Sequence, residues 1–141
     1  MRNISFSATV EAFKDQTKTV TRRLGWDDVY YGEELCGVEK GMGLKKGEKI
    51  NRLGVITVIC LNMEPLNNII KRPYRDDQCQ TIRRPKRSEV EREGFPEMTA
   101  EDFVEMFLKM HKGKKIDGEP ISETTQVKRV AFKYNKPLTI L

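Results

Sequence analysis

The strongest apolar run in the chain, Leu53 to Asn62, constrains the fold more than any other segment. It is rich in valine and isoleucine, and β-branched residues favour the extended backbone of a strand. An apolar run of this composition is typical of a central strand of a sheet. Gly54 near its start is expected to mark a β-bulge. We therefore expect the chain to be built around a strand at 53–62.

Other segments predict a mixture of strands and helices. Further strands are expected at 4–7, 17–23, 34–40 and 125–134, with an edge strand at 138–141, and a polar turn region is expected at 113–120. Helices are expected at 8–15 with Ser7 as its cap, at 66–70 after Pro65, at 88–93 ending at Gly94, and from the cap Thr99 onward. Because the strands do not alternate with helices, this order favours an α+β fold with a small barrel or half-barrel over a doubly wound sheet.

The last predicted helix carries an apolar stripe that we expect to pack in the core. Phe103, Met106, Phe107 and Met110 recur at helical spacing. His111, the single histidine of the chain, stands at the end of this helix beside two lysines. A cation is favourable there because of the helix dipole, so catalytic work is not expected from it.

Length and charge limit the class of protein. A chain of 141 residues fits one domain, 1–141, and its net charge of +5 favours polyanionic partners such as RNA, DNA or nucleotides. No stretch reaches the roughly 18 apolar residues of a membrane span, and no signal peptide is visible at the N-terminus. Three cysteines at wide spacing form no zinc pattern, and Cys36 and Cys60 are expected to be buried. We expect a cytoplasmic protein of bacterial or phage type with neither metal nor cofactor.

Residues 71–88 differ from the rest of the chain because they are basic and almost free of apolar side chains. Two interpretations remain open: a solvated loop inserted between structured parts, or an arm that orders on contact with phosphate. The residues that would contact phosphate are Arg83, Arg84, Lys86 and Arg87.

The segment Thr17 to Arg23 is the main candidate for a functional site. It contains a lysine, three threonines and two arginines in seven residues. In a regular strand Lys18 and Thr21 would point to opposite faces, but a bend near Val20 could bring them together. The segment alone fits either a solvated basic edge or an anion site.

The same segment carries a resemblance to a known family. Lys18-Thr19-Val20-Thr21-Arg22-Arg23, then Gly32-Glu33-Glu34-Leu35 at a strand start and Glu93-Gly94-Phe95 before the last helix, resemble the ASCH domain, a PUA-like β-barrel family. Two positions depart from the pattern: Gln16 replaces a glycine, and Glu33 replaces an aspartate. Residues 71–87 look like an insertion relative to compact members.

The resemblance implies a small PUA-like barrel flanked by a few helices, with a cleft for RNA or a nucleoside. Some small members are similar to amidohydrolases that deacetylate N4-acetylcytidine with a lysine, a threonine and a glutamate. Carried over by motif, these are Lys18, Thr21 and Glu93, with Arg23 in support and Glu91 as the alternative acid.

The general chemistry of lysine, threonine and glutamate fits hydrolysis, but it does not decide between hydrolysis and binding. A lysine of lowered pKa could remove the proton of a threonine, and a glutamate could pass a proton to the leaving amine. The alternative is binding alone, with Lys18, Arg22 and Arg23 on a phosphate and Trp26 or Tyr30 stacked on a base. Outside that role, Arg22 has no place in the motif and is expected to be a surface charge. A ribonuclease and a non-enzymatic interaction protein that engages nucleic-acid machinery are further alternatives.

Overall fold

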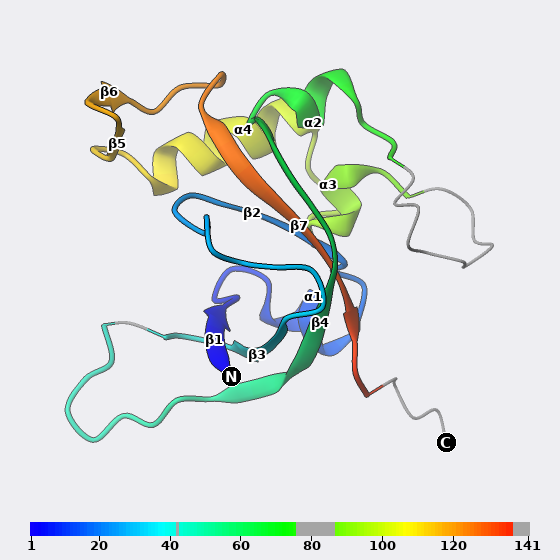
Figure 1. The fold of residues 1–141 in the computed structure, drawn as a ribbon, viewed down its shortest axis with the longest axis vertical. Coiled ribbons are helices and arrows are strands. Elements are labelled where there is room, and N and C mark those ends of the chain that lie inside the picture. Colours follow the sequence, from blue (N-terminus) through cyan, green and yellow to red (C-terminus); the bar gives the residue numbers. More distant parts are fainter. Residues whose placement is uncertain (42, 76–86, 137–141) are drawn as a thin grey trace.

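The computed structural model describes residues 1–41, 43–75 and 87–136 (Figure 1). Within these ranges the chain forms strands and helices in the order β1 (Arg2–Ser5), α1 (Val10–Lys14), β2 (Val20–Arg23), β3 (Glu34–Val38), β4 (Arg52–Pro65), α2 (Asn68–Lys71), α3 (Glu89–Arg92), α4 (Ala100–Met110), β5 (Lys115–Ile116), β6 (Glu119–Pro120) and β7 (Gln126–Tyr134). The predicted α+β class is confirmed. The predicted edge strand 138–141 and most of the basic segment 71–88 lie outside the described residues.

Five of the strands form one curled sheet, a half-barrel with the order β1-β3-β4-β7-β2. The pair β1–β3 is parallel, whereas β3–β4, β4–β7 and β7–β2 are antiparallel. Long β4 and β7 run side by side through the middle of the molecule in Figure 1. The predicted central strand at 53–62 is therefore confirmed, and it extends further at its C-terminal end.

The predicted bulge near Gly54 is also confirmed. Gly37 pairs with Gly54 while the next residue, Val38, pairs with Arg52, so Leu53 is the extra residue on β4. Gly54 has a φ of +152°, which lies in the region that side chains other than glycine avoid. A bulge bends a strand and increases its twist, which helps the sheet curl.

The two edge strands, β1 and β2, leave the half-barrel open on one side. A single side chain connects them: the Arg23 guanidinium on β2 donates a hydrogen bond to the backbone carbonyl of Ser5 on β1. This open side is where side chains from three parts of the chain meet.

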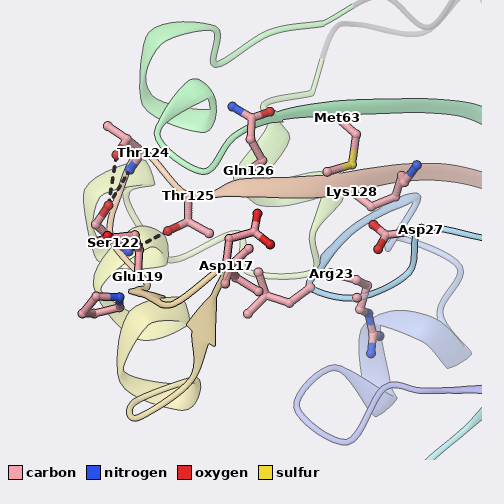
Figure 2. Close-up of a pocket in the computed structure, with 14 residues that line it drawn as sticks. Arg23, Asp27, Met63, Asp117, Glu119, Ser122, Thr124, Thr125, Gln126 and Lys128 are labelled. Atoms are coloured by element: carbon pink, nitrogen blue, oxygen red, sulfur yellow. Dashed lines mark hydrogen bonds between the residues drawn. The ribbon is translucent and has the colours of Figure 1, made fainter.

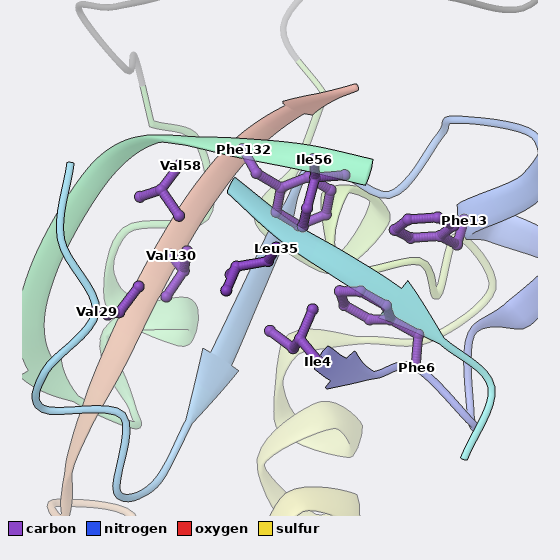
Figure 3. Close-up of a cluster of buried hydrophobic side chains, with 9 residues drawn as sticks. All are labelled: Ile4, Phe6, Phe13, Val29, Leu35, Ile56, Val58, Val130 and Phe132. Carbon is purple, nitrogen blue, oxygen red and sulfur yellow. The ribbon is translucent and has the colours of Figure 1, made fainter. Parts of the chain in front are cut away.

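Inside the curl lies the first hydrophobic core (Figure 3). The Phe13 ring stacks on Phe6 at 4.8 Å between centroids and meets the Tyr134 ring edge-on at 5.0 Å. These aromatic contacts attach α1 to the sheet. The buried members are Ile4, Phe6, Phe13, Val29, Leu35, Ile56, Val58, Val130 and Phe132.

A second core joins the helices to the start of β7. Phe103, Val104 and Phe107 of α4 are buried with Leu66, Ile69, Val90 and Val127. Helix α4 begins as predicted, because the Thr99 hydroxyl accepts a hydrogen bond from the Asp102 backbone N–H at 3.1 Å. Ser88 caps α3 in the same way through the Glu91 N–H.

Two local predictions were wrong, and a third was incomplete. Helix α1 begins after Thr9 rather than Ser7, because the Thr9 N–H turns back onto the Phe6 carbonyl. Pro65 ends β4 instead of opening a helix, since a strand end can lack an N–H donor. The turn region 113–120 contains a two-stranded hairpin, β5–β6. In the described part of the chain, no helix has the length and apolar character to cross a membrane.

We expect Gly37→Ala to destabilise the fold by about 1–3 kcal/mol through overpacking. A Cβ at position 37 would lie 2.5 Å from Phe13 Cζ, and that ring is held between Phe6 and Tyr134. Urea denaturation measures the change in the free energy of unfolding. Gly41→Ala is the matched control, because its Cβ meets only Val38 at 3.7 Å. Equal stability of the two variants would contradict this packing.

Candidate functional site

A pocket of about 150 Å³ lies on the open side of the sheet, between the segment after β1, strand β2 and helix α4. Its lining combines polar and charged side chains with aromatic and apolar ones. The polar members include Lys18, Thr21, Arg22, Arg23 and Glu93, and the apolar members include Phe6, Phe95, Phe103, Met106, Phe107 and Met110. All three residues of the predicted catalytic set thus line one pocket.

Lys18 is almost completely buried, with 3% of its surface exposed. Its Nζ donates to the backbone carbonyl of Glu93, lies 3.3 Å from Glu93 Oε1, and sits 5.6 Å from the centre of the Phe6 ring. Burial lowers the pKa of Lys18 to about 8, although the Glu93 carboxylate opposes the shift. A minority of the Lys18 amine is therefore neutral at pH 7, and most of it is neutral above pH 8.

Lys18 and Thr21 reach the same pocket because Lys18 precedes the regular strand. Strand β2 starts only at Val20, so the strict alternation of a strand at 17–23 does not apply. The Tyr134 hydroxyl donates to the Lys18 backbone carbonyl at 2.6 Å and fixes this bend. Burial raises the pKa of Tyr134, which keeps its hydroxyl protonated as a donor.

The Thr21 hydroxyl is polarised by its neighbour on the strand. Arg23 Nε donates to Thr21 Oγ1 at 3.0 Å, which leaves the hydroxyl proton for another acceptor. The Arg23 guanidinium also lies over the Phe6 ring at 5.1 Å. Burial lowers the pKa of Arg23 to about 10, so it is charged at neutral pH.

Glu93, not Glu91, is the acid at the pocket. Its Oε1 faces Lys18 and its Oε2 accepts from Arg22 Nη1 at 2.9 Å, whereas the Glu91 carboxylate accepts from the Ser88 hydroxyl. Gly94 has a φ of +103°, and a Cβ there would lie 3.0 Å from Thr9 Cγ2. Glycine at 94 therefore lets the end of α3 approach α1 and places Glu93 beside Lys18.

The expectation that Arg22 is a surface charge is wrong. Arg22 is 3% exposed, because β2 is covered on both faces. Its guanidinium contacts Glu89 Oε1 at 2.7 Å and Glu64 Oε2 at 3.5 Å besides Glu93. Burial opposes its charge, but these three carboxylates outweigh burial and raise the pKa of Arg22.

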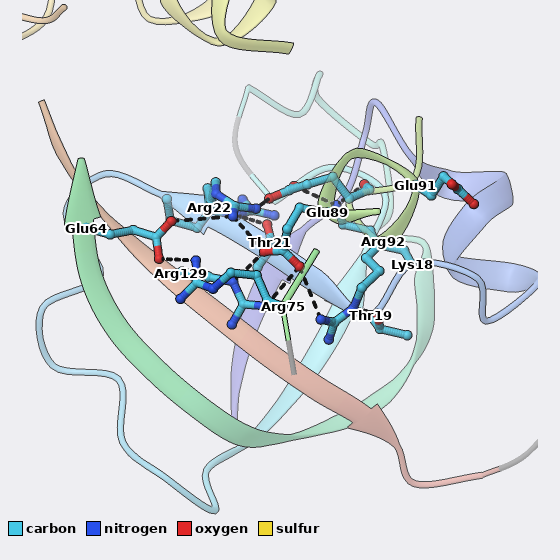
Figure 4. A network of polar contacts seen from close by, with 12 residues as sticks. Lys18, Thr19, Thr21, Arg22, Glu64, Arg75, Glu89, Glu91, Arg92 and Arg129 are labelled. Carbon is cyan, nitrogen blue, oxygen red and sulfur yellow. Dashed lines mark hydrogen bonds and ion pairs between the residues drawn. The ribbon is translucent and has the colours of Figure 1, made fainter. Parts of the chain in front are cut away.

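Arg22 belongs to a buried ionic network that sequence reasoning missed (Figure 4). Its hub is Glu89, which accepts from Arg129 Nε at 2.6 Å, from Arg22 at 2.7 Å and from Arg92 Nη1 at 3.1 Å. Glu64 adds a second carboxylate, paired with Arg75 Nη1 at 2.7 Å. Burial alone would raise the pKa of Glu89, but the Arg129 hydrogen bonds and the Arg22 charge outweigh it and hold that pKa below its usual value.

The apolar stripe of α4 has two roles rather than one. Phe103 and Phe107 pack in the second core, as expected, but they also line the pocket together with Met106 and Met110. His111 lines the pocket too. The spacing of the stripe predicted the burial of Phe103 and Phe107, but the expectation is wrong for Met110, which is 59% exposed at the end of the helix. The open side of the sheet beneath the stripe was not visible in the sequence.

The predicted stacking residues lie elsewhere. Trp26 packs against the first core with the Arg2 guanidinium 4.6 Å from its ring, and Tyr30 is 61% exposed in the loop after β2. Neither is among the residues that line the pocket. Arg87 donates to the backbone carbonyls of Thr17 and Glu91. The other predicted phosphate contacts, Arg83, Arg84 and Lys86, lie outside the described residues.

A larger hollow of about 590 Å³ adjoins the same strand (Figure 2). It lies between the β5–β6 hairpin and the strands β4 and β7, and Arg23 lines both hollows. Three carboxylates line it, from Asp27, Asp117 and Glu119, against the two cations Arg23 and Lys128. Its lining is therefore acidic on balance.

The described residues offer little to a metal ion or to cysteine chemistry. Outside the gaps at 42, 76–86 and 137–141, no group of three or more histidine, cysteine, aspartate or glutamate side chains is placed to hold a metal. Cys36 is buried as predicted, while Cys60 is only partly buried.

Comparisons with protein-family models, with curated proteins and with solved structures gave no match.

We expect Glu89→Gln to lower the free energy of unfolding by about 3–5 kcal/mol, because it removes the buried negative charge that Arg22, Arg92 and Arg129 share. The folded-state pKa of Glu89 is lowered, so its contribution is present at neutral pH and is lost as pH falls below the unfolded-state value. Urea denaturation between neutral and acidic pH measures both effects.

Glu105→Gln on the exposed face of α4 is the control, with an expected change within about 0.5 kcal/mol. A Glu89→Gln protein as stable as this control would contradict the role of Glu89 as a hub.

Proposed function

We propose that this protein binds a nucleoside in the pocket at the open side of a PUA-like half-barrel and hydrolyses its acetyl amide, with N4-acetylcytidine as the representative substrate. The observation that carries the proposal is that Lys18, Thr21 and Glu93, separated by up to 75 residues in the chain, line one pocket together with aromatic and apolar side chains. The resemblance of their sequence motifs to the ASCH domain supports the same assignment.

The size and lining of the pocket suit one pyrimidine ring. A cavity of about 150 Å³ accommodates a ligand the size of benzene. The rings of Phe6, Phe103 and Phe107 are buried against other side chains, so the half-buried Phe95 and Met106 offer the apolar surface for a base. Lys18 and Arg23 in the same lining offer hydrogen-bond donors to the acceptor atoms of the base.

The chemistry proceeds in two stages. Neutral Lys18 takes the proton of the Thr21 hydroxyl, and Thr21 Oγ1 attacks the carbonyl carbon of the acetyl amide. The C–N bond breaks, the proton held by Lys18 passes to the departing amine, directly or through the Glu93 carboxylate, and cytidine leaves an acetyl ester on Thr21. Water then hydrolyses this ester to acetate and restores the hydroxyl. The Arg23 guanidinium, 3.0 Å from Thr21 Oγ1, favours the negative charge that develops.

A free nucleoside fits the surroundings better than a polynucleotide. The larger hollow on the far side of Arg23 presents Asp27, Asp117 and Glu119, and these carboxylates would repel the phosphodiester of an adjoining nucleotide. The hydroxyls of a sugar carry no charge, so these carboxylates would not repel them.

Purified protein should convert N4-acetylcytidine to cytidine and acetate, as measured by chromatography. Lys18→Met, Thr21→Val and Glu93→Gln should each lower kcat at least about a hundredfold, because each removes a group that transfers a proton or forms the covalent bond. Since Lys18 must be neutral to act as base, the rate should rise with pH and level off above a pKa of about 8.

Lys14→Ala is the control, because Lys14 is exposed on α1 and is not among the residues that line the pocket. No turnover at high protein concentration would refute the hydrolase. Binding of nucleoside without turnover would leave a binding protein.

The salt dependence of the binding affinity distinguishes a nucleoside ligand from a nucleic-acid ligand. Cytidine affinity, measured by calorimetry, should change less than about twofold between roughly 50 and 200 mM salt, because no counterions are released. A single-stranded RNA that binds more tightly than cytidine, with an affinity that falls steeply with salt, would instead favour the polynucleotide.

A further inference from the structure

His111 is held in one orientation and one tautomer. Its ring stacks on Phe107 at 4.3 Å between centroids with an interplanar angle of 30°, and its Nδ1 lies 2.8 Å from the Phe107 backbone carbonyl. A carbonyl oxygen only accepts hydrogen bonds, so Nδ1 carries the proton. In the neutral ring Nε2 is then an acceptor.

In the described part of the chain, Nε2 has no hydrogen-bond partner, since the one hydrogen bond of the ring is made by Nδ1. His111 also lines the pocket. The ring is half-buried rather than enclosed. The stack on Phe107 already fixes the His111 ring, so a ligand would bind an Nε2 acceptor that needs no further ordering.

The pocket changes character from its closed end to its mouth. Lys18, Arg22 and Glu93 at the closed end are each 3% exposed, whereas Met110 beside His111 is 59% exposed. The closed end offers a hydrogen-bond donor from the Lys18 amine, which suits an acceptor atom of a pyrimidine. The mouth offers the His111 acceptor, which suits a donor on the part of the ligand that emerges.

We propose that His111 is a specificity-determining residue that accepts a hydrogen bond at Nε2 from a sugar hydroxyl of the ligand, so that the pocket selects nucleosides over free bases. The inference rests on the proposed nucleoside-binding function. In this proposal His111, at the end of helix α4, contacts the ligand but takes no part in the hydrolysis by Lys18, Thr21 and Glu93.

The test is a comparison of two ligands on two proteins. Calorimetry with cytidine and with cytosine should show that wild type prefers cytidine, and that His111→Phe loses roughly threefold to tenfold in cytidine affinity while cytosine affinity is unchanged. Phenylalanine keeps the ring stack on Phe107, and thermal unfolding checks that the variant is folded. Lys112→Ala, an exposed neighbour, should alter neither affinity.

A second measurement needs no variant. Because the chain has one histidine, the ¹⁵N spectrum of its imidazole reports His111 alone, with Nδ1 protonated and Nε2 shifting when cytidine is added but not when cytosine is added. Equal loss of both ligands in His111→Phe would assign a packing role and overturn the inference. Unchanged cytidine affinity in a protein that still binds or hydrolyses the nucleoside would overturn this inference alone. Failure of wild type to bind either ligand would overturn the proposed function with it.

Discussion

The rest of the site depends on the ion pairs that the buried Glu89 carboxylate makes. It joins arginines from three elements: Arg22 on β2, Arg92 on α3 and Arg129 on β7. Burying isolated charges is costly, and removing one partner leaves the others uncompensated. The network therefore fixes α3 against β2, and α3 ends at Glu93, whose carboxylate is divided between Arg22 and Lys18. The ionic network around Glu89 and the pocket are therefore directly connected through Glu93.

The second constraint is the incomplete closure of the sheet. With β1 and β2 at its two edges, the half-barrel keeps an open side, bridged by the hydrogen bond from Arg23 to Ser5. Helix α4 covers that side with a stripe that is wide enough for both a core and a pocket wall. A fully closed barrel would bury the same β2 side chains without leaving space for a ligand.

Local sequence signals predicted the elements better than the site. The β-branched run at 53–62, the cap Thr99 and the bulge at Gly54 depend on neighbouring residues, and all three are confirmed. Arg22 was misplaced because its burial depends on Glu89 and Glu64, 67 and 42 residues away in the chain. Alternation along one strand cannot reveal that both of its faces are covered. The contact between the Trp26 ring and Arg2 from β1 also joins distant parts of the chain and was not visible in the sequence.

The lowered pKa of Lys18 depends on how Glu93 is shared. A buried lysine facing an undivided carboxylate would be held in its charged form. Here Arg22 takes the other oxygen of Glu93 at 2.9 Å, and Arg22 and Arg23 both repel a charge on the amine. Burial and these two cations outweigh the remaining attraction, and the pKa of Lys18 falls to about 8. An amine of this pKa can both accept and return a proton near neutral pH. The arginine that sequence reasoning assigned to the surface is thus one of the groups that lower the pKa of Lys18.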